Sequence, residues 1–269
     1  MPELPEVEAA VRVLRAAAEG RTIVRARMMH RSLRAQVAPA RLRSLVGARV
    51  ERVERRGKHQ LLHLADGRAL HAHFRMAGDW LVDRAAAPRP RFARAVVELD
   101  DGARIWLVDP RALSTLELRN AAATLELGLG PEAIDPALRA DYLARALARR
   151  RGAIKPALLD QRLIAGIGNI YAVEALWRAR IDPRAPAASI TPRDLARLIV
   201  SIRSVMTRAL GGSIRYAVYG REGLPCRRCR NPVARIVQAG RSTYFCPHCQ
   251  TRPERADATI SRAPRAARP

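Results

Sequence analysis

The sequence is poor in acidic residues and in lysine. It has 25 Asp and Glu against 49 Lys and Arg in 269 residues, so its formal net charge is +24 at pH 7. Of the 49 basic residues only Lys58 and Lys155 are lysines. A positive excess of this size predicts a polyanionic partner, most often nucleic acid. Charge alone leaves the activity open, because a ribosomal protein would share it.

Long apolar runs are also missing. No stretch approaches the roughly 18 apolar residues that a membrane-spanning helix needs, and no secretory signal pattern opens the chain. These absences predict a cytoplasmic protein that does not contact the membrane. A chain of this length is nevertheless long enough to bury a core and to form two or three structural units.

Cysteine is absent from the first 225 residues. Cys226, Cys229, Cys246 and Cys249 then follow in the pattern C-x2-C-x16-C-x2-C. Two pairs of this spacing are typical of a four-thiolate zinc site, whereas an intracellular context disfavours disulfides. We therefore predict one structural Zn²⁺, with His248 as a bystander between two of its ligands.

The first half of the chain predicts a helix followed by β-structure. Val7, Val11 and Leu14 recur at helical spacing, and Gly20 follows the last of them. Six short apolar or alternating runs then predict strands, and Asp-Gly pairs predict hairpin turns between two pairs of them. The runs are 22–24, 50–53, 60–64, 69–74, 95–99 and 104–108, and a loop is expected at 84–90. This pattern predicts an antiparallel β-sandwich.

The second half predicts helices and a small finger. Helical periodicity covers 136–150, 156–165 and 170–179, with Asn169 as the expected cap of the third helix after a tight glycine turn. Such a turn lets backbone N–H groups approach a phosphate. A long helix opens with Thr191-Pro192-Arg193-Asp194 and ends at Gly211-Gly212. A two-stranded β-finger is expected around the cysteines.

The fold class is therefore predicted as α+β, in four parts. Residues 1–130 form the β-sandwich domain with its N-terminal helix, 131–215 a helical domain, 216–250 the zinc finger, and 251–269 a disordered basic tail.

The N-terminal segment has two possible interpretations. Removal of Met1 would leave Pro2 with a free secondary amine, which has a pKa of about 8 and acts as a nucleophile. Alternatively, Pro2 and Pro5 merely stiffen the entry to the first helix. These residues by themselves leave both interpretations open.

Four segments together resemble the formamidopyrimidine-DNA glycosylase / endonuclease VIII family of base-excision repair enzymes. They appear in the family's order and span residues 2–250. The segments are Pro2-Glu3-Leu4-Pro5-Glu6-Val7-Glu8, Arg56-Gly57-Lys58, Ala165-Gly166-Ile167-Gly168-Asn169-Ile170-Tyr171-Ala172 with Glu174, and the four cysteines with Gly240-Arg241.

The resemblance implies a helix–two-turn–helix DNA-binding unit in the helical domain and a bifunctional activity, DNA glycosylase and abasic-site lyase. Pro2 matches the nucleophile, which attacks the sugar carbon that carries the damaged base and forms an imine. Glu3 matches the general acid/base, and Lys58 matches a lysine of the catalytic site, at the tip of a strand turn, that contacts DNA near the lesion. Glu6 matches an acid that ties the N-terminal helix to the helical domain. The implied partner is double-stranded DNA with damaged bases or abasic sites, bound by a monomer at the nucleoid.

The resemblance also implies the DNA contacts. His73, Asn169 and Arg241 match residues that bind phosphates. Met76 and Arg111 match side chains that fill the space left by the flipped nucleotide. Lys155 is expected to contact the DNA backbone or, alternatively, to form a salt bridge.

The chain departs from the family pattern in several places. Leu113 replaces an aromatic wedge, Ala112 an arginine, and Arg75 a glycine. The family's long loop that closes over oxidised purines is largely missing after Arg215. Oxidised purines, oxidised pyrimidines, ring-opened purines and abasic sites therefore all remain candidate substrates. A protein that binds abasic or damaged DNA without cutting it is the alternative function.

Overall fold

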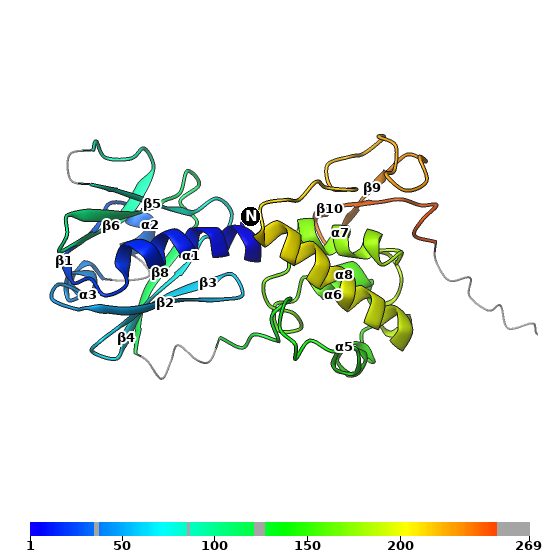
Figure 1. Cartoon of the computed structure of the whole chain (residues 1–269), viewed down its shortest axis with the longest axis horizontal. Coiled ribbons are helices and arrows are strands. Elements are labelled where there is room, and N and C mark those ends of the chain that lie inside the picture. The colour runs from blue at the N-terminus through cyan, green and yellow to red at the C-terminus, as the bar shows by residue number, and fades with distance from the viewer. Residues whose placement is uncertain (35–37, 85–86, 121–126, 252–269) are drawn as a thin grey trace, which may run out of the picture.

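The computed structural model describes residues 1–34, 38–84, 87–120 and 127–251. The described residues up to 120, with their strands and first helices, form one lobe, and the helices and the finger after residue 127 form another (Figure 1). The N-terminus lies where the two lobes meet, so the chemically unusual first residues lie at the junction between them.

The N-terminal lobe is a sandwich of two four-stranded antiparallel sheets. One sheet has the order β1-β6-β7-β5 and the other β2-β3-β4-β8. The strands are β1 (Ile23–Met28), β2 (Val50–Arg56), β3 (His59–Leu64), β4 (Arg68–His73), β5 (Asp79–Arg84), β6 (Ala93–Leu99), β7 (Ala103–Val108) and β8 (Thr115–Asn120). The sandwich predicted from the alternating runs is confirmed.

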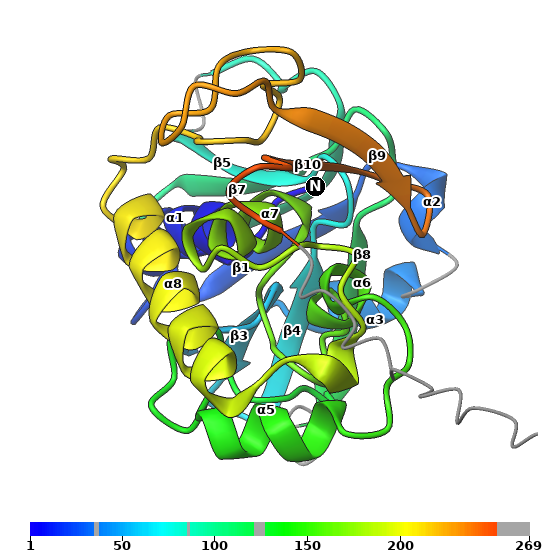
Figure 2. The same ribbon diagram turned by 90° about the vertical axis from the view of Figure 1, so that its right-hand side faces the viewer.

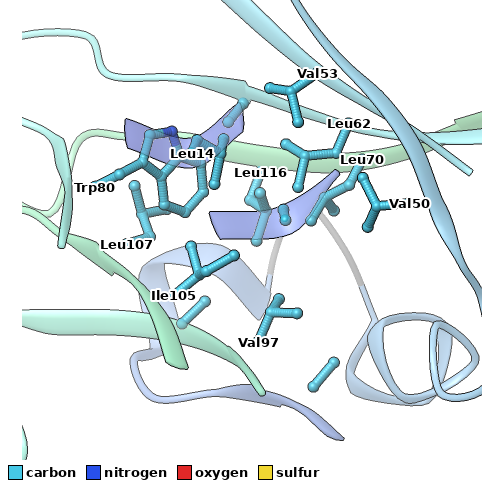
Figure 3. Close-up of a cluster of buried hydrophobic side chains, with 14 of the residues drawn as sticks. Leu14, Val50, Val53, Leu62, Leu70, Trp80, Val97, Ile105, Leu107 and Leu116 are labelled. Atoms are coloured by element: carbon cyan, nitrogen blue, oxygen red, sulfur yellow. The ribbon is translucent and has the colours of Figure 1, made fainter. Parts of the chain in front are cut away.

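The core of this lobe lies between the sheets and includes helix α1 (Leu4–Ala18). Leu14 of α1 is fully buried among side chains from both sheets, such as Leu62 and Ile105 (Figure 3). The apolar stripe of α1 therefore fixes the start of the chain against the sandwich. Two short helices, α2 (Arg31–Arg34) and α3 (Pro39–Arg43), follow β1.

Two strands were missing from the sequence prediction. In β5 only Trp80 is buried, so its alternation is weak. In β8 the buried residues are Leu116 and Leu118, which alternate with polar ones over a short stretch. Both strands lie at sheet edges, where a strand pairs on one side only and a strong alternation of apolar and polar residues is not needed.

The helical lobe contains α5 (Ala140–Leu147), α6 (Ile154–Leu158), α7 (Asn169–Arg178), a 3-10 turn η1 (Ala187–Ser189) and α8 (Pro192–Leu210). The helix predicted for 136–150 starts only at Ala140. The prediction of a helix over 156–165 was wrong, because α6 ends at Leu158. The Gln161 side chain there accepts from Gly166 N–H and donates to two backbone carbonyls, which favours a turn.

The predicted start of the long helix is confirmed. Thr191 caps α8, since its hydroxyl oxygen accepts a hydrogen bond from Asp194 N–H at 3.1 Å, and Gly211 follows the last turn. This helix packs on α7 and supplies much of the lobe's core, including Leu198 and Ile202.

The finger is a hairpin of β9 (Ala234–Gln238) and β10 (Arg241–Phe245). Ala239 and Gly240 join them with positive φ angles of 48° and 71°, as a tight two-residue hairpin turn requires. The predicted disordered tail lies, beyond Thr251, outside the described residues. Within the described residues, no helix combines the length and apolar character that crossing a bilayer requires.

Candidate active site

A cavity of about 480 Å³ opens at the junction of the sandwich, the helical lobe and the finger. In the view of Figure 2 the N-terminus lies close to α7 and β10. The residues predicted from the sequence that line this cavity are Glu3, Lys58, His73, Met76, Asn169 and Arg241. Residues more than 230 positions apart in the chain thus share one site.

The glycine turn before α7 makes room for the N-terminal segment. Leu4 N–H donates to the Gly166 carbonyl at 3.0 Å, and a Cβ on Gly166 would lie 2.9 Å from the Leu4 Cβ. A Cβ on Gly168 would lie 2.6 Å from Glu3 Oε1. Glycine is therefore required at both positions so that the first residues can dock on the helical lobe.

The Glu3 carboxylate caps helix α7. It accepts hydrogen bonds from Ile170 N–H at 2.8 Å and Tyr171 N–H at 3.4 Å. The prediction that Asn169 caps this helix was wrong, because the N-cap position is Gly168. The Asn169 Nδ2 instead donates to the Ser242 carbonyl at 3.0 Å and joins α7 to the finger.

Glu3 is buried beside a buried lysine. Its side chain is 2% exposed, and burial raises its pKa although Lys58 and the two N–H groups of α7 oppose the shift. Burial likewise lowers the pKa of Lys58, which is 5% exposed. The carboxyl group therefore holds its proton to a higher pH than an exposed glutamate would.

Glu6 connects α1 to both Glu3 and the helical lobe. One carboxylate oxygen accepts from Glu3 N–H at 2.9 Å, and the other accepts from the Tyr171 hydroxyl at 2.5 Å. Together with the hydrogen bond from Val7 N–H to the Glu3 carbonyl, these contacts fix the orientation of Glu3 from both sides. They are the kind of contacts that the sequence led us to expect of Glu6.

The turn that carries Lys58 is anchored to the segment between the lobes. Arg55 is nearly buried, at 8% exposure of its side chain, and donates to Glu132 Oε1 at 2.6 Å and to Glu8 Oε2 at 2.7 Å. Gly57 N–H donates to the same Glu132 carboxylate. Charge-assisted contacts of this kind restrict where the Lys58 ammonium lies.

Lys155 is fully buried on α6, and among the described residues its Nζ has neither a hydrogen-bond partner nor a salt bridge. Burial and the positive charge of Arg241 lower its pKa to about 8, while Glu3 opposes the shift. A buried ammonium without an anion is costly. The position next to Arg241 and Glu3 is therefore set up to receive an anion.

The predicted wedge residues are exposed. Met76 is 42% exposed and Leu113 45%, and Arg111 is also exposed. The loop of Arg111 and Leu113 is held by the Asp109 carboxylate, which accepts from the N–H groups of Arg111, Leu113 and Ser114. Arg75, at the position where the family has glycine, adopts a φ of +54°. The side chains of Arg111 and Leu113 are thus exposed to solvent while hydrogen bonds to Asp109 hold their backbone.

Sequence reasoning missed the residues that form the cavity wall near the finger. Tyr219 and Tyr244 line it and pack edge to face, with ring centroids 5.3 Å apart. The buried Glu174 carboxylate accepts from the N–H groups of 217–219 and so holds Tyr219 in place. The sequence analysis named Glu174 as part of the third family segment but gave it no role, although an acidic residue on an otherwise apolar helix was a signal for one.

The four cysteines form one cluster. Their Sγ atoms all lie within 4.8 Å of one another, and all four cysteines are free of disulfides. Sγ distances of 4.0 Å for Cys226–Cys249 and 3.4 Å for Cys229–Cys246 are close to the roughly 3.8 Å expected around tetrahedral zinc. The donor set and spacing fit one structural zinc ion.

Three family models match the chain in order. They are the formamidopyrimidine-DNA glycosylase N-terminal domain over residues 1–116, its H2TH domain over 129–217, and the zinc finger found in FPG and IleRS over 223–252.

Whole proteins match as well. Formamidopyrimidine-DNA glycosylases of Paracoccus denitrificans and Chloroflexus aurantiacus are 41% and 40% identical, cover 93% of this chain, and are themselves covered over 100% and 98% of their length. The Lactococcus lactis enzyme, solved non-covalently bound to DNA with an abasic site, superposes with a TM-score of 0.87 at 29% identity over 93% of this chain and 100% of that one. The chain therefore belongs to the formamidopyrimidine-DNA glycosylase family.

Proposed function

We propose that this enzyme is a bifunctional DNA glycosylase and abasic-site lyase of base excision repair, and that Pro2 is its nucleophile. The observation that carries the proposal is the buried, α7-bound Glu3 carboxyl group at a cavity that also presents Lys58 and Arg241. The cavity places the proposed proton donor and these cationic groups next to the N-terminus of the chain. Neither lobe could form this arrangement alone.

In the proposed reaction the secondary amine of Pro2 attacks C1′ of the damaged nucleotide. A C–N bond forms, the glycosidic bond breaks, and the base leaves with that electron pair and takes up the proton that the new ammonium releases. The lone pair that deprotonation restores to the nitrogen then forms an iminium at C1′ as the C1′–O4′ bond breaks and O4′ takes up a proton. Loss of a C2′ proton expels the 3′ phosphate and cleaves the strand. The reaction requires that Met1 be removed, since an acylated Pro2 nitrogen has no nucleophilic lone pair.

Glu3 is the proposed proton donor to the opening sugar ring. Its raised pKa keeps more of it protonated near neutral pH, as a general acid needs. The hydrogen bonds from Ile170 and Tyr171 hold the Glu3 carboxyl group in one orientation, so the entropy of orienting it is lost on folding and not during the reaction.

Lys58, His73, Asn169 and Arg241 are the proposed phosphate contacts, and Lys155 is the proposed additional cation behind Arg241. Met76, Arg111 and Leu113 are proposed to enter the duplex in place of the flipped nucleotide. The tyrosine wall is proposed to receive the flipped base, because aromatic faces stack on any base.

The proposed partner is double-stranded DNA with an oxidised base or an abasic site, bound by a monomer in the cytoplasm, at the nucleoid and away from the membrane. The Lactococcus lactis protein, by its title, binds abasic-site DNA. A nicking panel over oligonucleotides with oxidised purines, ring-opened purines, oxidised pyrimidines and abasic sites identifies the preferred lesion.

Borohydride reduction tests the mechanism. Protein whose mature N-terminus is Pro2 by mass spectrometry should be trapped covalently on abasic-site DNA, and Glu3→Gln combined with Pro2→Gly should abolish trapping. Glu98→Gln is the matched control, because Glu98 lies on the interior strand β6, far along the sandwich, with its carboxylate 3.7 Å from Arg25. Tight binding to an abasic analogue without adduct or nicking would instead support the non-cleaving binder.

A further inference from the structure

Three histidines lie side by side on the face of the β2-β3-β4-β8 sheet that points away from the sandwich core. His59 on β3 pairs with His73 on β4, and His71 lies two residues before His73 on the same face. The alternate residues of these strands, Leu62 and Leu70, are in the core. Strand alternation therefore places all three imidazoles together.

The rings form a continuous chain of contacts that starts at the cavity. His73 lines the cavity, and its ring centroid is 4.8 Å from that of His59. The His59 and His71 rings are stacked with centroids 5.0 Å apart, and His59 Nδ1 is 2.8 Å from His71 Nε2. His71 is buried, at 3% exposure.

Neighbouring groups favour one proton position on each ring, by a hydrogen bond at His73 and by the charge of a nearby carboxylate at His71. Arg75 N–H donates to His73 Nδ1 at 3.0 Å, so neutral His73 carries its proton on Nε2. Glu117 Oε2 is 3.8 Å from His71 Nδ1, which favours a proton on that nitrogen. His71 Nε2 then accepts from His59 Nδ1–H, and this leaves His59 Nε2 with a free lone pair.

Burial, reinforced by the positive charges around the cluster, keeps the three rings neutral in the free protein. Burial lowers the pKa of His59 and His71 to about 4, and the positive charge of Arg119 on β8 adds to both shifts. Burial lowers the pKa of His73 to about 3, with contributions from its neighbours His59, Arg75, Lys58 and His71. Among the described residues, the anion that opposes the shifts of His59 and His71 is Glu117 on β8. A phosphate at the cavity would add a second negative charge.

We propose that His59 and His71 are positioning residues that present His73 as an Nε2–H donor to a DNA phosphate, and that this histidine cluster takes up a proton when the phosphate binds. The proton comes from solvent, and no covalent bond changes. The proposal rests on the proposed function, because it needs DNA at the cavity. In this proposal His59 and His71 act on the DNA only through His73 and do not contact the DNA themselves.

The test uses the full chain and a duplex with a tetrahydrofuran abasic-site analogue. Calorimetry at pH 6 in two buffers of different ionisation enthalpy gives the number of protons taken up, and NMR of ¹⁵N-labelled protein gives the tautomer of each ring. The variants are His59→Phe and His71→Phe, which keep the stacked rings and remove the hydrogen bond. His71→Gln restores an acceptor for His59.

The wild type should take up a fraction of a proton per duplex, while both Phe variants should lose that uptake and bind about fivefold more weakly, as expected for one hydrogen bond. His71→Gln should recover the affinity. His63→Phe is the matched control and should behave as wild type, because His63 lies on β3 but bonds to Glu54 and Arg52. Any proton that Glu3 or Lys155 takes up on binding is the same in the wild type and the variants, so it cancels in the difference in proton uptake between them.

The idea is overturned if the wild type takes up no proton, or if the His59→Phe protein matches it in proton uptake and in affinity for the duplex. The half-buried His59 decides the outcome if the buried His71 variants unfold. A wild type that neither prefers the abasic duplex nor forms a borohydride adduct would refute the proposed function itself, which is a different result.

Discussion

Gly168→Ala should disable the enzyme without removing any group that touches DNA. The Gly168 backbone has an extended φ of −137°, so alanine meets no backbone strain there. Its Cβ would, however, lie 2.6 Å from Glu3 Oε1 and 2.7 Å from Glu3 Cγ. Since non-bonded contacts lie at roughly 3.5 Å or more, the carboxyl group must move by about 1 Å.

That displacement breaks the hydrogen bonds from Ile170 and Tyr171 and misplaces the proton donor. A shift of 1 Å costs about 100-fold in rate, or about 2.7 kcal/mol of transition-state stabilisation. Overpacking should also lower the free energy of unfolding by about 1 to 3 kcal/mol. Affinity for DNA should change little, because Lys58 and Arg241 are untouched.

Single-turnover base release and borohydride trapping measure the rate, and urea unfolding measures the stability. Gly152→Ala is the matched control, because nothing lies within 4 Å of a Cβ at that position and its φ is not positive. Activity of the Gly168 variant within about threefold of wild type, well short of the loss expected from a 1 Å shift, would refute the steric argument. An equal loss in the Gly152 variant would refute it as well.

Three further predictions follow from the described contacts. Glu174→Gln weakens the charge-assisted bonds from the N–H groups of 217–219, so the free energy of unfolding should fall by about 1.5 to 3 kcal/mol in urea and processing of lesions should slow as Tyr219 moves. Chelation of zinc should unfold the finger and abolish abasic-DNA binding, with metal release and loss of affinity occurring together. Lowering the pH from 7 to 5 should reduce the free energy of unfolding by about 1 to 2 kcal/mol for each of His59 and His71. The reason is that these rings bind a proton below about pH 6.5 in the unfolded chain but only below about pH 4 in the folded protein. Thermal unfolding across that range measures it, and a flat profile would contradict the burial of these rings.

The glycine turn shows how one motif serves two purposes. Its sequence predicted a turn whose backbone N–H groups can approach a phosphate. In the free protein the N–H groups of Ile170 and Tyr171 bind the chain's own Glu3 carboxyl group. The turn therefore positions the proposed catalytic acid, and the phosphate contact proposed for Asn169 uses a neighbouring side chain.

Several features could be predicted from the sequence because their signals are local. The cysteine spacing, the cap at Thr191, the stripe of α1 and the first β-hairpins each depend on residues within a short stretch. Local signals failed where side chains compete with the helix, as at Gln161, and at the weakly patterned edge strands β5 and β8.

By itself the sequence determined a cationic protein with a sandwich, a helical unit and a zinc finger, and it indicated Pro2 and Glu3 through a family motif. Only the tertiary structure decided that Glu3 is a buried acid that caps α7, and that Tyr219 and Tyr244 line the cavity. It also decided that Lys155 is a buried cation with no partner among the described residues. The reason is physical. The raised pKa of Glu3 comes from desolvation, and the cavity is formed by contacts between residues far apart in the chain. Neither produces a periodic pattern of residues that could be recognised in the sequence.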